Sequence, residues 1–222
     1  MAFCMTQLSK WIPVGLPLVL AIGTAGAAPR QHTVLLGPWR TASVITESGK
    51  TVPVKIRKLM VDDRFKESTA GPSHDVSDRL FVVRKAAQLN DSLPQDANKT
   101  PRWIWRIEGW VGVDRQTGHV TQLNLPMFDR ETSDVSWYRD LAAYCGTSDD
   151  RSKAYLIVFQ LGKRKPLLKK EFTGEPCSAP TWERQPTRVT FLNGPAKNSF
   201  IVTSRGADLQ TEPPEQDEDE SE

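Results

Sequence analysis

The chain has 222 residues, of which 38% are hydrophobic and 25% are charged, and its formal net charge is +2. It is long enough for one domain with a single sizeable core. The spacing of its 3 histidines and 3 cysteines matches no metal-binding motif. The glycines form no phosphate-cradling or dinucleotide-binding loop, so the sequence predicts no metal site and no cofactor.

The first 27 residues have the three-part plan of a secretory signal peptide. A polar start with one charge, Lys10, precedes an apolar run over 11–23, and small residues follow. We expect cleavage after Ala27, because a cut one residue later would place Pro29 next to it. A membrane anchor is the alternative, but a helix over this run would span only about 20 Å, against about 30 Å of hydrocarbon. The sequence therefore predicts an extracytoplasmic protein, periplasmic or secreted.

Charges are unevenly distributed along the chain. Of the 29 basic and 27 acidic residues, the signal peptide contains one basic residue, and 211–222 contains seven acidic residues and no basic one. Residues 28–210 therefore hold 28 basic and 20 acidic residues. A like-charged segment with no large apolar side chain cannot bury enough surface to offset its ordering entropy. We expect a single β-rich domain over 28–210 and a disordered acidic tail over 211–222.

Two cysteines, Cys145 and Cys177, remain after removal of the signal peptide. In an oxidising compartment such a pair is expected to form a disulfide. On the chain-entropy model, closing a loop of about 33 residues stabilises the fold by about 3 to 4 kcal/mol. Two buried free thiols, or a metal site with two ligands, are the alternatives.

The N-terminal half of the mature chain predicts several short strands. Apolar runs at 34–36, 44–45 and 80–83 are compact and lie close to turn residues. Over 51–61 apolar and polar residues alternate, which places one face of a strand in a core and the other in water. Pro53 cannot donate to a ladder of hydrogen bonds, so this strand lies at an edge or begins there.

Two polar segments in this half predict loops. The segment 62–78 is expected to hold one helical turn around Phe65 and a loop through Gly71-Pro72-Ser73. The segment 90–101 has little apolar content and predicts a surface loop of uncommon length.

The segment 103–125 predicts a β-hairpin. In 103–113 the side chains of Trp103, Trp105 and Ile107 fall on one face, which we expect to pack in the core. The turn that follows ends at Gly118, where glycine tolerates the positive φ that another residue would resist.

The segment 134–146 is compatible with two structures. Asp134 as N-cap, an apolar face and Gly146 just past the end describe a short helix, which we favour slightly. A strand entering the turn at 148–150 is the alternative.

The C-terminal part predicts further hairpins. Residues 155–161 and 167–172 form one pair of strands, and 189–192 and 200–203 form the last pair across Asn193-Gly194-Pro195. The predicted fold is therefore mainly β, an antiparallel sandwich, barrel or meander of eight to ten strands with at most one or two short helices.

The sequence contains no recognisable catalytic set. Ser73-His74-Asp75 has the residue types of a catalytic triad, but adjacent residues rarely point at one another as a triad requires. A Gly-x-Ser-x-Gly elbow is absent from the sequence. An acid and a base could still meet in three dimensions, for example among Glu108, Asp140 and Asp149.

Two groups of side chains are candidate binding sites. Trp137, Arg139 and Asp140 combine a stacking surface with a cation and a carboxylate, and they form either a small cleft or a core aromatic with a local ion pair. The other group is a basic hairpin, which can attract anionic lipid or polysaccharide or can simply blunt a sheet edge. It consists of Lys163, Arg164, Lys165, Lys169 and Lys170.

The leading hypothesis is an exported, non-enzymatic β module that binds a partner protein or an anionic envelope component. Nucleic acid is disfavoured as a partner because the protein is expected outside the cytoplasm. The acidic tail can also fold back over the basic hairpin and compete with outside anions. The alternative is an exported hydrolase or carbohydrate-active protein whose site is assembled only in three dimensions.

Overall fold

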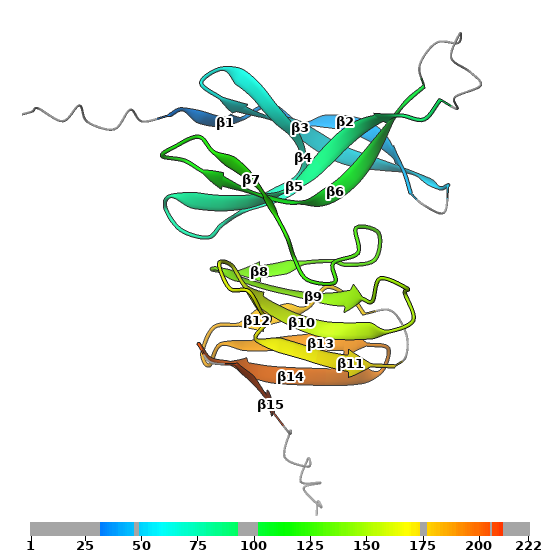
Figure 1. Cartoon of the computed structure of the whole chain (residues 1–222), viewed down its shortest axis with the longest axis vertical. Helices are drawn as coiled ribbons and strands as arrows, with labels where there is room; N and C mark the ends of the chain where they lie inside the picture. Colours follow the sequence, from blue (N-terminus) through cyan, green and yellow to red (C-terminus); the bar gives the residue numbers. More distant parts are fainter. Residues whose placement is uncertain (1–31, 47–48, 93–101, 174–176, 205, 211–222) are drawn as a thin grey trace, which may run out of the picture.

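The computed structural model describes residues 32–46, 49–92, 102–173, 177–204 and 206–210. These residues form fifteen β-strands in three sheets and no helix, which confirms the predicted β class (Figure 1). Among them there is accordingly no helical segment that could cross a membrane. The predicted signal peptide, the acidic tail and most of the predicted loop at 90–101 lie outside the described residues.

The first sheet, sheet A, closes on itself. Its strands are β1 (Val34–Leu36), β2 (Arg40–Ile45), β3 (Thr51–Val61), β4 (Arg64–Asp75), β5 (Leu80–Asn90), β6 (Trp103–Asp114) and β7 (Val120–Leu123). They are ordered β1-β3-β2-β6-β5-β4, β4 also pairs with β3, and β7 pairs with β6. Every pairing is antiparallel except that of β2 with β6, which is parallel and rests on the single residue pair Val44 and Trp105.

The side chains inside sheet A form two clusters. Large residues such as Leu59, Phe81 and Val113 are fully or almost fully buried in the first cluster. The second contains Ile56 with the buried Ala70 and Ala86, and the partly buried Ala42, Val54, Trp105 and Ile107 pack against them. The second cluster therefore mixes three alanines with larger side chains, whereas the first contains no alanine.

The other two sheets face each other beneath sheet A. Sheet B contains β8 (Ser136–Tyr138), β9 (Leu141–Thr147), β10 (Ala154–Gln160) and β11 (Leu168–Phe172). Sheet C contains β12 (Thr181–Glu183), β13 (Arg188–Asn193), β14 (Ala196–Val202) and β15 (Ala207–Gln210). Leu156 of sheet B packs with Phe191 and Phe200 of sheet C, and none of the three is more than 2% exposed.

Sheet B lies between the other two sheets, because both of its faces are buried. One face packs on sheet C, and the other packs Tyr144 and Ile157 against Val82 and Trp110 of sheet A. Figure 1 shows the resulting stack, with sheet A above and sheets B and C below. The near-continuous apolar run in β10 follows from burial on both faces.

Cys145 and Cys177 form a disulfide, and their Cα atoms are 6.1 Å apart. Cys145 belongs to β9, and Cys177 makes a β-bridge with Asn193 of β13. The bond therefore joins sheet B to sheet C. It is compatible with the oxidising compartment that the sequence predicts.

The hairpins predicted from local patterns are present. The segment 103–125 folds as β6 and β7, and Gly118 has a φ of 65°. The predicted pairs of strands in the C-terminal part are also formed, as β10 with β11 and β13 with β14. Pro53 lies in the part of β3 that pairs with β2 alone, which agrees with the predicted edge position.

The slightly favoured helix over 134–146 is wrong. The segment folds as the hairpin β8–β9, with Ser136 opposite Ala143 and Tyr138 opposite Leu141. Arg139 makes the turn possible by adopting a φ of 52°, which is uncommon for a residue other than glycine.

Other local predictions also require correction. The expected helical turn at Phe65 and the expected loop at 71–73 are both parts of β4, whose register shifts between Ala70 and His74. Trp103 does not pack in the core, because it is 58% exposed. Trp105 and Ile107 are partly buried, as predicted for that face.

Candidate functional site

The basic hairpin does not form one surface. Lys169 and Lys170 are consecutive residues of β11 and point to opposite faces of sheet B. The Lys169 ammonium lies 4.6 Å from the ring centre of Tyr155, and that of Lys170 lies 5.6 Å from Phe200 of sheet C. The remaining three cations, Lys163, Arg164 and Lys165, are exposed in the turn before β11, which is an edge strand.

Of Trp137, Arg139 and Asp140, Trp137 packs its side chain against sheet A, while the other two side chains have partners within sheet B. The Trp137 ring is 5.3 Å from Trp110 and 6.0 Å from His74, both in sheet A. Asp140 accepts a hydrogen bond of 2.8 Å from the Gln160 side chain, and Arg139 lies over the ring of Tyr138 at 5.5 Å. These contacts favour the interpretation of Trp137 as a packed aromatic residue.

The three residues of the triad-like sequence have separate partners. The Ser73 hydroxyl accepts a long hydrogen bond of 3.4 Å from Arg57. His74 Nε2 is 2.8 Å from the backbone oxygen of Arg139, and Asp75 forms an ion pair with Arg115 at 2.6 Å. The three side chains therefore do not form a nucleophile, base and carboxylate relay.

The carboxylates that sequence reasoning put forward are also dispersed. Glu108 pairs with Arg130 at 3.6 Å, while Asp149 lines a polar hollow of about 330 Å³ together with Asp129. Burial of Asp129 disfavours its charged form, but the backbone hydrogen bonds from Glu131 and Thr132 and the charge of Arg151 together lower its pKa. A general acid at neutral pH needs a raised pKa, so Asp129 is suited to hold its neighbours and not to donate a proton.

A second polar hollow brings together two histidines that are distant in the sequence. His32 and His119 line a space of about 510 Å³, and His32 Nδ1 lies 2.7 Å from Asp62 Oδ2. A Cβ atom at Gly118 would come within 2.5 Å of Val61 Cγ1 and 3.3 Å of the His32 side chain, so glycine permits this close packing. In the described part of the chain, no group of three or more histidine, cysteine or acidic residues could hold a metal ion.

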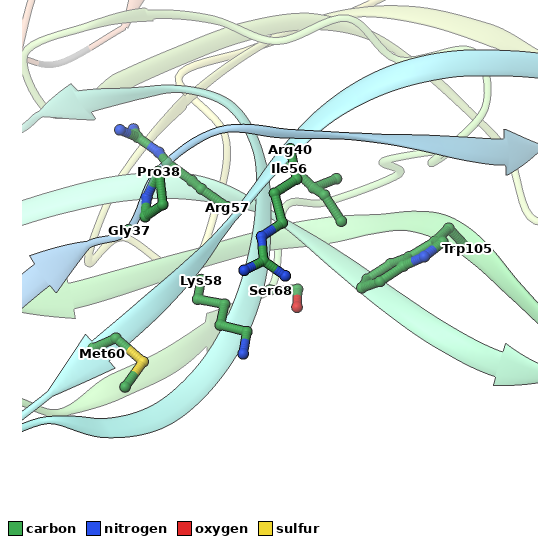
Figure 2. A pocket seen from close by; sticks show the side chains of 9 residues that line it. All are labelled: Gly37, Pro38, Arg40, Ile56, Arg57, Lys58, Met60, Ser68 and Trp105. Carbon is green, nitrogen blue, oxygen red and sulfur yellow. The ribbon is translucent and has the colours of Figure 1, made fainter.

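The strongest candidate site is an apolar pocket at one end of sheet A. It has a volume of about 220 Å³ and is shown in Figure 2. Its lining residues come from the β1–β2 connection and from strands β2, β3, β4 and β6: Gly37, Pro38, Arg40, Ile56, Arg57, Lys58, Met60, Ser68 and Trp105.

The pocket lies where the alternation of inward-facing and outward-facing side chains along β3 is broken. Ile56 and Leu59 are both buried although they are three residues apart, so the inward-facing side of β3 changes between them. Ile56, Lys58 and Met60 lie on one face of β3. This face points into sheet A at Ile56 and away from its interior at Met60, and the pocket lies between these two residues.

The opposite wall stays open because β2 and β6 barely pair. Their only paired residues are Val44 and Trp105, so Arg40, at the start of β2, has no partner on β6. Figure 2 shows Trp105 across the pocket from Met60, with Arg40 and Ser68 between them. The small side chains of Ala70 and Ala86 line the interior beyond Ile56.

Two cations meet at the pocket mouth. In Figure 2 the Arg40 guanidinium and the Lys58 ammonium extend to the same side, near the Ser68 hydroxyl. Both side chains are exposed, and neither forms an ion pair with a carboxylate of the residues that the structure describes. The mouth is therefore a positively charged spot with an apolar floor.

Arg57 lines the pocket but points elsewhere. Its guanidinium lies 4.2 Å from the ring centre of Trp39, and burial lowers its pKa. It thus supports the wall with its aliphatic stem, while its charge interacts with an aromatic face.

Sequence reasoning missed this pocket. The only signal was the shift of the apolar positions in β3 from Val52, Val54 and Ile56 to Leu59 and Val61, which marks the break in alternation. No family model matches the chain, and no curated protein and no solved structure was found to be similar to it.

Proposed function

We propose that the protein is an exported, non-enzymatic β module that binds an anionic component of the cell envelope, and that the pocket of sheet A is its binding site. One observation carries the proposal: Arg40 and Lys58 meet beside the Ser68 hydroxyl without a carboxylate partner among the described residues. Two neighbouring cations repel each other, and an anion placed between them removes this repulsion.

The alternative of a hydrolase has weaker support. Hydrolysis by two carboxylates needs an acid with a raised pKa facing a second carboxylate. Asp129 has a lowered pKa, Glu108 is held by Arg130, and Asp140 is held by Gln160. The pair of His32 and Asp62 is the closest approach to an acid–base arrangement, but among the described residues its hollow is lined by no serine or cysteine, and Thr117 supplies a hydroxyl there.

Export supports an envelope ligand over a cytoplasmic one. The signal-peptide pattern of the first 27 residues and the disulfide between Cys145 and Cys177 are both consistent with an oxidising compartment. Anionic head groups and polysaccharides are abundant at such surfaces, and they attract exposed cations.

Cosedimentation with lipid vesicles tests the proposal. We expect the mature chain to bind vesicles rich in phosphatidylglycerol and not vesicles of phosphatidylcholine alone, with binding that weakens as salt shortens the screening length to below about 10 Å. The double variant Arg40→Gln, Lys58→Gln should lose this binding.

The matched control removes the same charge from the exposed turn of the basic hairpin. The double variant Lys163→Gln, Lys165→Gln should bind anionic vesicles like the unchanged protein. Equal binding of both vesicle types, or loss of binding only in the control variant, would contradict the proposed site.

A further inference from the structure

The pocket continues into an exposed apolar row on the outside of sheet A. Met60 is paired with Leu35 on β1 and with Phe65 on β4, so the three side chains stand in line on one face. Leu35 is 51% exposed and Phe65 is 53% exposed. Single exposed apolar residues are ordinary, but this row shares Met60 with the pocket and so extends it.

Together, the row and the pocket form an apolar track from the surface to the interior of sheet A. The track begins at Leu35 and Phe65, passes Met60 and ends at Ile56, which packs with the buried Ala70. Pockets that enclose a whole drug-sized ligand have volumes of about 300 to 1,000 Å³. At about 220 Å³ this pocket is smaller and suits a slender part of a ligand, such as the end of an acyl chain.

The apolar track is interrupted by one charged side chain and flanked by two further polar residues. Lys58 lies within it, with its ammonium 5.9 Å from the ring centre of Phe65, and its four-carbon stem can cover apolar surface while the charge reaches water. Arg40 and Ser68 complete a set of two cations and one hydroxyl. Their combined charge of two matches that of a phosphate monoester, whose oxygens accept several charge-assisted hydrogen bonds.

We infer that the ligand is a single-chain amphiphile with a phosphate head group, bound as a monomer. This inference rests on the proposed function and adds the class of ligand. The acyl chain lies along the row and enters the pocket, and the phosphate binds Arg40, Lys58 and Ser68. A soluble anion would leave the apolar track exposed to water, and a flat bilayer surface would not reach into the pocket. A single-chain amphiphile can cover the track, enter the pocket and pair with the cations.

Calorimetric titration with three matched compounds below their micellar concentrations tests the inference. Dodecyl phosphate has the chain and the charge, ethyl phosphate has the charge with almost no chain, and dodecylphosphocholine has the chain with a zwitterionic head. Each buried methylene group strengthens binding roughly fourfold. We therefore expect dodecyl phosphate to bind the mature chain at least about tenfold more tightly than either of the others.

Two variants test where the acyl chain of the ligand binds. Met60→Trp places a larger side chain where the exposed row enters the pocket, and Leu35→Ser with Phe65→Ser removes the exposed row without disturbing a buried residue. Each should reduce the affinity for dodecyl phosphate at least about tenfold, which corresponds to two or more methylene groups returned to water, and should leave the affinity for ethyl phosphate unchanged. Circular dichroism and thermal unfolding verify that both variants are folded.

The measurements distinguish a failure of the single-chain ligand from a failure of the proposed anion-binding function. Equal affinities for dodecyl phosphate and ethyl phosphate would overturn the inference and leave the proposed function standing. Binding to anionic vesicles without binding to monomeric dodecyl phosphate would overturn it in favour of a bilayer surface. Absence of binding to any phosphate compound and to anionic vesicles would overturn both.

Discussion

Sheet A and the sandwich of sheets B and C are both built mainly from antiparallel strands, but their interiors are filled differently. Between sheets B and C the interior is filled by large, fully buried side chains such as Leu156 and Phe191. In sheet A the interior near Ile56 combines alanines with Trp105 and Ile107, and the pocket lies beside it. Sheet A also has a closely packed cluster around Leu59 and Val113, so the pocket is a local feature of one part of sheet A.

The two cations at the pocket mouth can be compared with those of the sandwich. In the sandwich Lys169 and Lys170 lie over aromatic rings, and Arg188 pairs with Glu183 at 2.9 Å. At the pocket mouth of sheet A, Lys58 lies 5.9 Å from the ring centre of Phe65, and neither Arg40 nor Lys58 has a carboxylate partner in the described part of the chain. Exposed cations of this kind contribute little to stability and can pair with an anion from outside.

The largest expected effect is loss of the bond that joins the two sheets of the sandwich. Replacing Cys145 and Cys177 by serine should lower the free energy of unfolding by about 3 to 4 kcal/mol, because the open loop regains entropy in the unfolded chain. Urea unfolding of the oxidised protein, the reduced protein and the double variant measures this. A reduced protein as stable as the oxidised one would show that packing alone holds the sandwich.

Loss of the Tyr144 hydroxyl should also lower the free energy of unfolding, but by less. It is fully buried between sheets A and B, and its hydroxyl donates a hydrogen bond of 2.6 Å to the backbone oxygen of Pro126. Burial raises the pKa of this hydroxyl, so it stays neutral. Tyr144→Phe should cost about 1 to 2 kcal/mol in chemical denaturation, since it leaves a buried carbonyl without its donor. An unchanged midpoint would show that water replaces the hydroxyl.

Removing the two charges at the pocket mouth should abolish ligand binding and leave the stability of the fold almost unchanged. Arg40→Gln with Lys58→Gln should change the free energy of unfolding by no more than about 0.5 kcal/mol, because both side chains are exposed and unpaired with any described carboxylate. The same variant should lose binding to anionic vesicles. A large loss of stability would mean that these cations hold the fold.

The smallest expected effect lies in the turn before β10. Hydrogen bonds from the Ser148 and Ser152 hydroxyls lower the pKa of Asp150 to about 2. A carboxyl group with a lowered folded-state pKa stabilises the fold above its unfolded-state value of about 4, and this contribution is lost as pH falls from about 4 to about 2. Carboxyl NMR titration should find the midpoint near the lower value, and Asp150→Asn should remove this part of the acid dependence. A midpoint near the ordinary value would contradict the turn geometry.

The sequence predicted those parts of the fold that depend on local patterns. The hairpin of β6 and β7 combines alternation with a glycine turn, and both signals act within a few residues. The strand β4 was missed because Gly71 and Pro72 resemble a loop, whereas its conformation is set by pairing with β3 and β5. The turn at Arg139 was missed because no residue type there signals a positive φ.

The candidate site was less accessible to sequence reasoning. Arg40 and Lys58 come from different strands, and they meet only because β2 and β3 pair beside the break in alternation. The basic hairpin was visible as a run of cations, but a strand sends Lys169 and Lys170 to opposite faces. Closeness in sequence was thus a poor guide to a shared surface.

Amide hydrogen exchange of the mature chain with and without dodecyl phosphate tests most directly whether sheet A holds the binding site. We expect slower exchange in peptides covering Gly37 to Met60, around the pocket of sheet A, and unchanged exchange in β10 and β11 of the sandwich. Slower exchange confined to the basic hairpin, with none around the pocket, would contradict this expectation and return the binding site to the sandwich.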